Sequence, residues 1–193
     1  MSNLPAIALI EFGSIAAGMF AADKMVKRAP IELLHAGTVQ PGKYLVLIGG
    51  GTAEVEESYR AGTQAAPNEI LDDVMLPDAH HQVVRALDGE RRFSEFESML
   101  VLETSTIAAI LRSTDAAVKS AAVELAELRI GNGLNGRGLA VLTGDLTNVE
   151  VAAEIAARAL DGRNVTLCHS IVSNVHEQFA GHVSNTTRFF HGK

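Results

Sequence analysis

The chain of 193 residues contains one cysteine, no tryptophan and only five prolines. The single cysteine, Cys168, excludes an internal disulfide and any metal site built from paired cysteines of one chain. A reducing, cytoplasmic environment is therefore expected. No apolar run approaches the roughly 18 residues that a membrane-spanning helix needs. The first residues carry no basic region, which predicts that the chain has no secretory signal.

Positive charge is also scarce. The chain has 16 basic and 23 acidic residues, which gives a formal net charge of −7. General affinity for nucleic acid depends on neutralising phosphates, so this balance argues against such a partner. The nearest approach to a basic cluster is Lys24, Lys27 and Arg28, which is too small to change that conclusion. We expect neither nucleic acid nor a membrane among the partners.

What the sequence does contain is a duplication. Residues 8–27 resemble residues 100–119, with Glu11 matching Glu103 at an offset of 92. The offset grows to 94 where Lys43 meets Arg137, and to 96 where His80 meets His176. Similarity that continues through two small insertions indicates a duplicated domain. We expect domains at residues 1–90 and 97–193, with a polar linker between them.

Each copy is predicted to fold as strand, helix, strand, turn, strand, helix, strand and short helix. In the first copy the strands are expected at residues 6–12, 31–39, 44–48 and 70–76, and the short helix at 77–87. The turn between the second and third strands predicts that they pair antiparallel. The fold class is therefore α+β, with two tandem ferredoxin-like domains, each an antiparallel four-stranded sheet with helices on one face. The tail, residues 181–193, has no usable periodicity.

Helix signals support this order. Ser14, Thr52 and Thr106 are predicted to cap helices, because their hydroxyls can accept hydrogen bonds from first-turn amides. Thr147, with Glu150 three residues later, is predicted to form a capping box. The apolar face of the first helix is expected at Ile15, Met19, Ala22 and Val26, which follow helical spacing.

The segment Gly49-Gly50-Gly51 invites a comparison with phosphate-binding loops, since it lies between a strand and a helix. Its pattern is neither a Walker loop nor a dinucleotide fingerprint. Glu54 and nearby acids would repel phosphate. We interpret it as a structural break.

Histidines and one thiol are the remaining candidates for chemistry. His80, His81 and His176 lack a carboxylate pattern that completes a metal site, and are expected to serve as caps or packing residues. Cys168 and His169 are adjacent in a predicted strand, so their side chains point to opposite faces, and a buried inert thiol is expected. Glu11 and Glu103 are interpreted as structural. No catalytic or metal-binding constellation emerges.

Asp23 with Lys27, and Asp115 with Lys119, lie four residues apart on helices. Such pairs support isolated helices by about 0.2–0.5 kcal/mol. Their recurrence in both copies would be equally natural if both helices faced a repeated interface. The sequence leaves these two interpretations open.

With the elements placed, the residues resemble a known family. The runs Ile7-Ala-Leu-Ile-Glu11, Asp23-Lys-Met-Val-Lys27, Val39-Gln-Pro-Gly-Lys43 and Leu47-Ile-Gly-Gly50 are similar to those of a bacterial microcompartment shell domain. The second copy repeats the likeness in Val101-Leu-Glu103, Thr114-Asp-Ala-Ala-Val-Lys119 and Leu142-Thr-Gly144.

A tandem pair in this strand order resembles the non-permuted, trimer-forming class of the family. The resemblance implies a homotrimer that forms a flat pseudohexameric tile in the shell of a microcompartment in the cytoplasm. It further implies a structural role without enzyme activity, and other shell proteins, both hexamers and pentamers, as partners. Small metabolites are expected to pass a central pore.

The family places the turn between the second and third strands at the pore. Here that implies a lining of Gln40, Pro41 and Gly42 from one copy, and Gly133, Leu134, Asn135 and Gly136 from the other. The family's tile-edge lysine matches Lys27 and Lys119.

Some relatives carry a cysteine in place of Gln40 and hold an iron–sulfur cluster. Because an amide supplies no thiolate, we expect no cluster and no other cofactor or metal here. The pore itself is expected to be neutral, with Lys43 and Arg137 giving its mouth a positive potential.

A second interpretation stays open. The chain could be a cytosolic ferredoxin-like enzyme, or a ligand-binding regulatory protein, with a site between its two repeats. A bound small molecule or any turnover would favour that interpretation. Formation of sheets or polyhedra would favour the shell protein.

Overall fold

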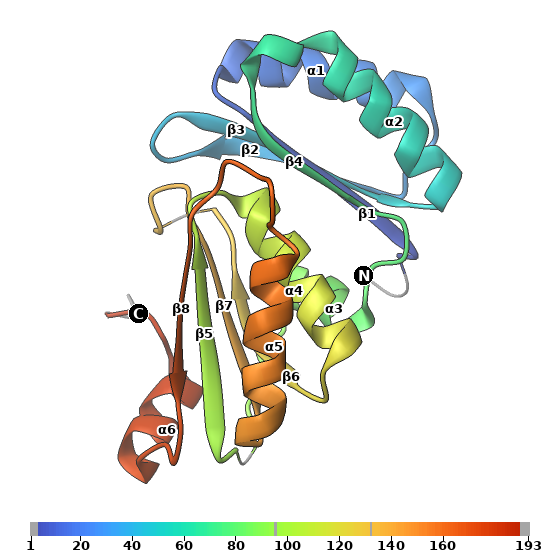
Figure 1. Cartoon of the computed structure of the whole chain (residues 1–193). Coiled ribbons are helices and arrows are strands. Elements are labelled where there is room, and N and C mark those ends of the chain that lie inside the picture. The colour runs from blue at the N-terminus through green and yellow to red at the C-terminus, as the bar shows by residue number, and fades with distance from the viewer. Residues whose placement is uncertain (1–3, 95, 132, 190–193) are drawn as a thin grey trace.

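The computed structural model describes residues 4–94, 96–131 and 133–189. Each repeat contains a four-stranded antiparallel sheet, and the two sheets share one topology (Figure 1). The strand order is β2-β3-β1-β4 in the first repeat and β6-β7-β5-β8 in the second. This order confirms the predicted α+β fold of two tandem domains.

The first repeat closely follows the expected element order. Its elements are β1 (Ala6–Phe12), α1 (Ile15–Arg28), β2 (Leu33–Val39), β3 (Lys43–Gly50), α2 (Thr52–Ala65), a short 3₁₀ turn (Pro67–Glu69), β4 (Ile70–Leu76) and α3 (His81–Leu87). The predicted bounds of β1 and β4 are confirmed. The predicted break after Ile48 is wrong, because β3 continues through Gly49 and Gly50. A Cβ on Gly49 would lie 2.8 Å from Leu4 Cδ1, so this glycine makes room for Leu4 within a continuing strand.

The second repeat has the same order. Its elements are β5 (Ser98–Thr104), α4 (Ile107–Ser120), β6 (Glu124–Arg129), β7 (Gly138–Gly144), α5 (Leu146–Arg158), β8 (Leu167–Val172) and α6 (Glu177–Asn185). A bulge lies in β6 between Leu125 and Glu127. The helix α6 includes residues 181–185 of the tail, although the sequence there shows no clear helical periodicity. None of the helices in the described ranges is long and apolar enough to cross a bilayer.

Two of the predicted helix caps are confirmed. Ser14 Oγ accepts from the Ala17 amide at 3.3 Å, and Thr106 Oγ1 accepts from the Ala109 amide at 3.3 Å. Each hydroxyl satisfies an amide that has no partner within its helix.

Two other cap predictions are wrong. The residue before α2 is Gly51, and Thr52 begins the helix while its hydroxyl donates to the Pro77 carbonyl at 3.1 Å. Asp145 caps α5, because its Oδ1 accepts from an amide of the first turn at 2.9 Å. Thr147 therefore lies inside α5 and forms no capping box.

One helix serves both sheets. The helices α1 and α2 cover one face of the first sheet, and α4 and α5 cover one face of the second (Figure 1). The other face of the first sheet rests on α4, so Leu9 and Val74 share a buried cluster with Ile107 and Leu111. The first sheet thus lies between its own helices and a helix of the second repeat.

Candidate assembly interface

A buried carboxylate anchors the junction between the two repeats. Glu11 is fully buried, and its Oε1 accepts a 2.6 Å hydrogen bond from the Ala108 amide in the first turn of α4. Its Oε2 lies 3.1 Å from Lys43 Nζ, which also donates to the Gly136 carbonyl at 3.2 Å. Burial raises the pKa of Glu11, while the Ala108 amide and Lys43 oppose that rise. The structural role expected for Glu11 is thus a joint between β1, a helix N-terminus and the second pore turn.

A second group of charges lies where β4 meets the start of α4. Thr106 Oγ1 donates to Asp72 Oδ2 at 2.5 Å, and Arg163 Nη2 donates to Asp72 Oδ1 at 3.2 Å. Arg163 and Arg112 also donate to the Asp73 carbonyl, at 2.9 and 3.1 Å. The junction within one chain is therefore held by ion pairs as well as by apolar packing.

The helix α3 completes this junction by packing on β6. Its N-cap His80 accepts from the Gln82 amide at 3.4 Å, which confirms the cap prediction, and the His80 amide donates to Asp115 Oδ1 at 2.8 Å. The Gln82 side chain accepts from the Leu125 amide at 2.6 Å and donates to the Val123 carbonyl at 3.3 Å. Sequence reasoning missed Gln82, although an identical residue, Gln178, stands at the same offset of 96 as the paired histidines.

The matching surface of α1 is open. On α4, Ile107 and Leu111 are fully buried and Val118 is 6% exposed. Their equivalents on α1 are Ile15, Met19 and Val26, which are 37%, 54% and 39% exposed. Of the predicted apolar face of α1, only Ala22 lies on its own sheet, together with the buried residues Gly18, Ala21 and Met25, so the prediction is wrong for Ile15, Met19 and Val26.

The outer face of the second sheet is open in the same way. The strand registers match Leu9, Glu11 and Asp72 of the first sheet to Val101, Glu103 and Cys168 of the second. The first three are buried, whereas Val101 and Glu103 are half-buried and Cys168 is exposed. The prediction of a buried thiol is therefore wrong, because none of the described residues covers that end of the face as α4 covers the first sheet.

The start of α6 repeats the start of α3 without its contacts. His176 Nδ1 accepts from the Gln178 amide at 3.2 Å, so the paired histidines are both helix caps. Gln178 and Phe179 are exposed, whereas their equivalents Gln82 and Val83 pack at the junction between the repeats. Three surfaces therefore occur twice in the chain. They are buried on α4, the first sheet and α3, and open on the equivalent α1, second sheet and α6.

The two predicted pore turns lie side by side. A Cβ on Gly136 would stand 2.9 Å from the Gln40 carbonyl oxygen, and the φ of Gly136 is +72°, so only glycine fits there without strain. Gln40, Pro41, Gly42, Gly133 and Asn135 are exposed, and Leu134 is half-buried. The Gln40–Pro41 peptide bond is cis.

The charges next to these turns are not free. Lys43 is paired with the buried Glu11, and its side chain is 16% exposed. Arg137 pairs with Glu103 on the surface. Pairing therefore reduces the positive charge that these two cations would give a pore mouth, and the reduction is greater for Lys43, whose side chain is the less exposed.

The two candidate edge lysines differ in setting. Lys27 forms an exposed pair with Asp23 at 2.7 Å. Lys119 pairs with Asp115 at 2.6 Å, where the carboxylate is 6% exposed, and its ammonium donates to the Asp78 carbonyl of the first repeat. The second pair therefore faces an interface, as one of the two interpretations held, while the first pair faces solvent in the single chain.

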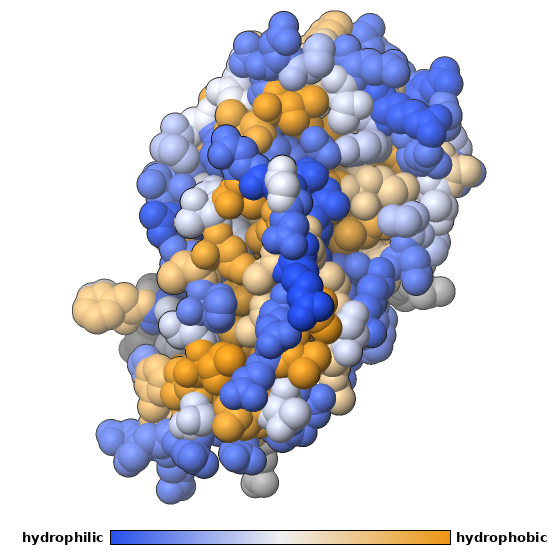
Figure 2. All heavy atoms as spheres, viewed as in Figure 1, coloured by the Kyte–Doolittle hydropathy of each residue, from blue (hydrophilic) through white to orange (hydrophobic). Residues whose placement is uncertain are grey.

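Further apolar surface lies on the side occupied by α5. Figure 2 shows hydrophobic surface on both sides of a polar stripe that overlies this helix. Leu146 and Val151 of α5 are 37% and 40% exposed. A cavity of about 280 Å³ adjoins the junction and is lined mainly by apolar residues of β1, β2 and β3. Among the described residues, no three His, Cys, Asp or Glu side chains gather as a set that could hold a metal.

These surfaces define a class of protein: a tandem α+β chain whose two repeats meet in one contact, while the equivalent surfaces of α1, α6 and the second sheet stay open. A family model described as the BMC domain matches residues 6–79 and again residues 98–175. The chain belongs to the BMC-domain family.

Known relatives agree with this assignment. The bacterial microcompartment shell protein PduT of Citrobacter freundii is 31% identical over 172 residues, which cover 89% of this chain and 94% of that protein. The carboxysome assembly protein CcmO of Synechococcus elongatus is 28% identical over 174 residues, and the match covers 82% of this chain and 61% of CcmO.

Solved structures agree as well. A microcompartment protein from Desulfitobacterium hafniense DCB is 36% identical with a TM-score of 0.78, over 92% of this chain and 98% of that one. The fused permuted hexameric shell protein of the RMM microcompartment reaches a TM-score of 0.56 over 79% of this chain and 80% of its own, at 24% identity, and supports the fold alone.

Proposed function

We propose that this chain is a structural protein of a bacterial microcompartment shell, without catalytic activity, and that three copies form a pseudohexameric tile with a central pore. Membership of the BMC-domain family and the names of its relatives support the shell role. The observation that carries the trimer is the pair of equivalent surfaces, buried within the chain and open at its ends. The division into domains at residues 1–90 and 97–193 belongs to the same proposal.

The open surfaces complement each other. The exposed stripe of α1 has the residues that on α4 cover the first sheet, and the second sheet has an uncovered outer face. Seating α1 of one chain on the second sheet of the next would repeat the contact that α4 makes inside the chain. A contact of this head-to-tail kind generates a ring when its rotation closes. Three chains then supply six repeats.

Such a ring brings the two kinds of pore turn into alternation. In this arrangement Gln40, Pro41 and Gly42 alternate with the turn at 133–136 around the axis, as they already adjoin within one chain. The lining then consists of amides, backbone groups and the Leu134 side chain, which favours small polar metabolites without strong selection by charge sign. Iron and other metals are absent from this proposed pore.

The perimeter of the tile would meet other shell proteins. We assign Lys27 and Lys119 to this edge, where hexameric and pentameric shell proteins are the proposed partners. Lys119 is partly engaged at the junction, so Lys27 is the freer of the two. The alternative of an enzyme or ligand-binding regulator with a site between the repeats is the weaker proposal, because buried side chains and paired charges fill the centre of the junction. The adjoining cavity of about 280 Å³ is lined mainly by apolar residues.

A cross-link between chains tests the proposed contact. Within the chain, the side chains of Thr106 and Asp72 meet at 2.5 Å. Ser14 is equivalent to Thr106, and Cys168 is equivalent to Asp72. Ser14→Cys should therefore place a thiol opposite Cys168 of a neighbouring chain. Mild oxidation should give disulfide-linked dimers and trimers on a non-reducing gel. Lys24→Cys, on an exposed position of the same helix, is the matched control and should not cross-link.

Native mass completes the test. The wild-type protein should have three times the mass of the 20.4 kDa chain. A stable monomer or dimer at micromolar concentration would sink the trimer. A trimer that fails to cross-link through Ser14→Cys would show that the chains meet through other surfaces.

A further inference from the structure

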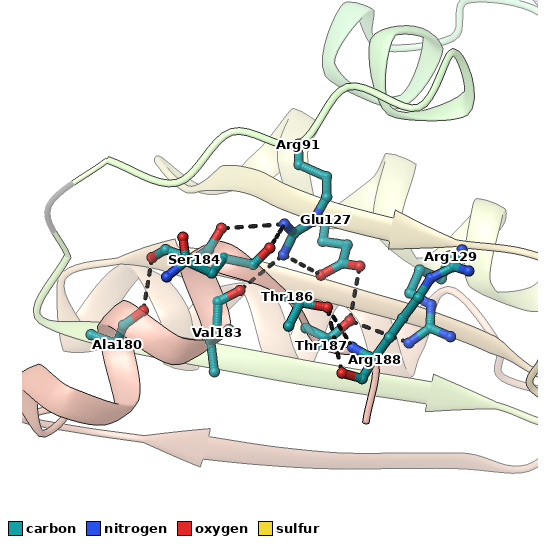
Figure 3. A network of polar contacts seen from close by, with 10 residues as sticks. Arg91, Glu127, Arg129, Ala180, Val183, Ser184, Thr186, Thr187 and Arg188 are labelled. Atoms are coloured by element: carbon teal, nitrogen blue, oxygen red, sulfur yellow. Dashed lines mark hydrogen bonds and ion pairs between the residues drawn. The ribbon is translucent and has the colours of Figure 1, made fainter. Parts of the chain in front are cut away.

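The C-terminal end of α6 is fastened to the second sheet by an arginine of the linker (Figure 3). Arg91 Nη1 donates to the Ser184 and Asn185 carbonyls at 3.2 and 2.9 Å, and Nη2 donates to the Val183 carbonyl at 2.9 Å. These carbonyls end a helix and have no amide partner within it. Arg91 Nη2 also lies 3.0 Å from Glu127 Oε2, which fixes the end of α6 against β6.

This fastening brings two further arginines together. Thr187 Oγ1 donates to Glu127 Oε1 at 2.9 Å and accepts from Arg129 Nη1 at 3.2 Å. The Arg188 amide donates to Thr186 Oγ1 at 2.9 Å, which turns the chain so that the Arg188 side chain extends beside Arg129 (Figure 3). The carboxylate of Glu127 is already engaged by Arg91 and Thr187.

Neither Arg129 nor Arg188 has an acidic partner in the parts of the chain that the structure describes. Both guanidinium groups line an open cavity of about 450 Å³, together with Gly133, Leu134, Thr187 and Phe189. Two cations side by side repel each other unless an anion lies between them. This arrangement is unusual in a chain whose formal net charge is −7.

We propose that Arg129 and Arg188 form a binding site for a small oxyanion, with a carboxylate or a phosphate as the recognised group. A planar guanidinium presents paired N–H donors that match the two oxygens of either group. Thr187 acts as a positioning residue, because its hydroxyl is committed to Glu127 and orients Arg129. Arg91 supports the site indirectly, because it binds the carbonyls of residues 183–185 and so holds the segment that carries Arg188.

The first repeat has no such site. The strand registers match Arg129, opposite Leu139, to Gly37, opposite Leu45, so a glycine stands where the second repeat has an arginine. One site per chain follows. Gly133 and Leu134 belong to the proposed pore lining, so a trimer would place three of these sites around one pore mouth. That placement rests on the proposed function, whereas anion binding by Arg129 and Arg188 does not.

Titration calorimetry of the full chain tests the site. Inorganic phosphate and acetate are titrated separately in Tris chloride buffer, so that the two recognised groups are distinguished. At least one of them should bind saturably with one site per chain. Arg188→Gln should lower the affinity about tenfold or more, since hydrogen bonds to charged groups are the strong ones. Arg188 is exposed, so this change should leave the fold intact.

Two further variants sharpen the result. Arg129→Gln should reduce the affinity as Arg188→Gln does. Arg158→Gln, which removes an exposed arginine of α5 paired with Glu154, is the matched control and should bind like the wild type. No saturable heat with either anion up to about 50 mM, or an affinity unchanged by Arg188→Gln, would overturn the proposal.

The native mass of the same samples separates this inference from the trimer. Loss of binding in a variant that remains trimeric supports the site. Retained binding in wild-type protein that is monomeric would support the site while refuting its place at a pore mouth.

Discussion

Met19 and Leu111 occupy the same position in the two repeats, and truncating each to alanine should have opposite consequences. Leu111 is fully buried between the two sheets, whereas Met19 is 54% exposed in the single chain. If α1 seats on the neighbouring chain as α4 seats on the first sheet, Met19 becomes buried only in the trimer. Met19→Ala should then weaken association, and Leu111→Ala should weaken folding.

The magnitudes follow from burial. Removing buried methylenes by a Leu→Ala change costs about 2–5 kcal/mol of unfolding free energy, because a cavity remains. Fully burying a methionine side chain contributes about 1.5–3 kcal/mol. Roughly half of Met19 is left to bury, so each junction should lose about 1 kcal/mol, and three junctions about 3 kcal/mol. That loss corresponds to roughly a hundredfold fall in the trimer association constant.

Sedimentation velocity over a range of concentrations measures the association, and urea unfolding measures the stability of the chain. Lys24→Ala, on the solvent side of α1, is the control and should change neither. Trimer association within about twofold of the wild type for Met19→Ala would refute the reasoning. An equal loss of folding stability from Met19→Ala and Leu111→Ala would refute it too, because Met19 would then belong to the core of one chain.

Three other changes test separate features. Glu11→Gln should lower the unfolding free energy by about 2–4 kcal/mol at pH 7, because Lys43 is left beside a neutral partner, and combining it with Lys43→Met should recover most of the loss in urea unfolding. Burial, and then the charge of His81, lower the pKa of His80 below its ordinary 6.5. The unfolding free energy should therefore fall as pH falls from 7.5 to 5.5, and it should fall less in His80→Asn, because asparagine caps a helix without titrating. Parallel pH profiles of the two proteins would contradict this. Lys27→Glu should keep the native trimer mass, because an exposed ion pair contributes under about 1 kcal/mol to folding. It should reduce the number of sheets seen by negative-stain microscopy, because the reversed charge places like charges along the edge. Unchanged sheets would contradict the edge assignment.

The sequence predicted what depends on local signals. The apolar run at residues 6–12 and the hydroxyls of Ser14 and Thr106 act through neighbours in the chain, and the structure agrees with each of them. The duplication predicted the tandem architecture, because two copies of one pattern fold alike. The equivalence of His80 and His176 as helix caps was accessible for the same reason.

Local signals misplaced one strand end, at Gly49 and Gly50, and two caps, at Thr52 and Thr147. The other errors concern what covers a surface. Helical spacing marked Ile15, Met19 and Val26 as apolar, but spacing does not reveal whether the partner is the helix's own sheet or a second molecule. The same ambiguity made Cys168 look buried. The pairing of Lys43 with Glu11 joins segments far apart in sequence to a third, the α4 N-terminus, and only the folded junction brings these groups together.

The dependence of the first sheet on α4 also has a consequence for synthesis on the ribosome. When β4 has emerged, the outer face that includes Leu9 and Val74 has no cover, because α4 lies downstream. At about 5–20 residues per second, the 44 residues from the end of β4 to the end of α4 take on the order of 2–9 s to add. During that interval the nascent first repeat exposes a complete apolar sheet face. Chaperones that recognise nascent chains should therefore engage this protein in that window, and pausing of translation between residues 77 and 120 should increase its aggregation.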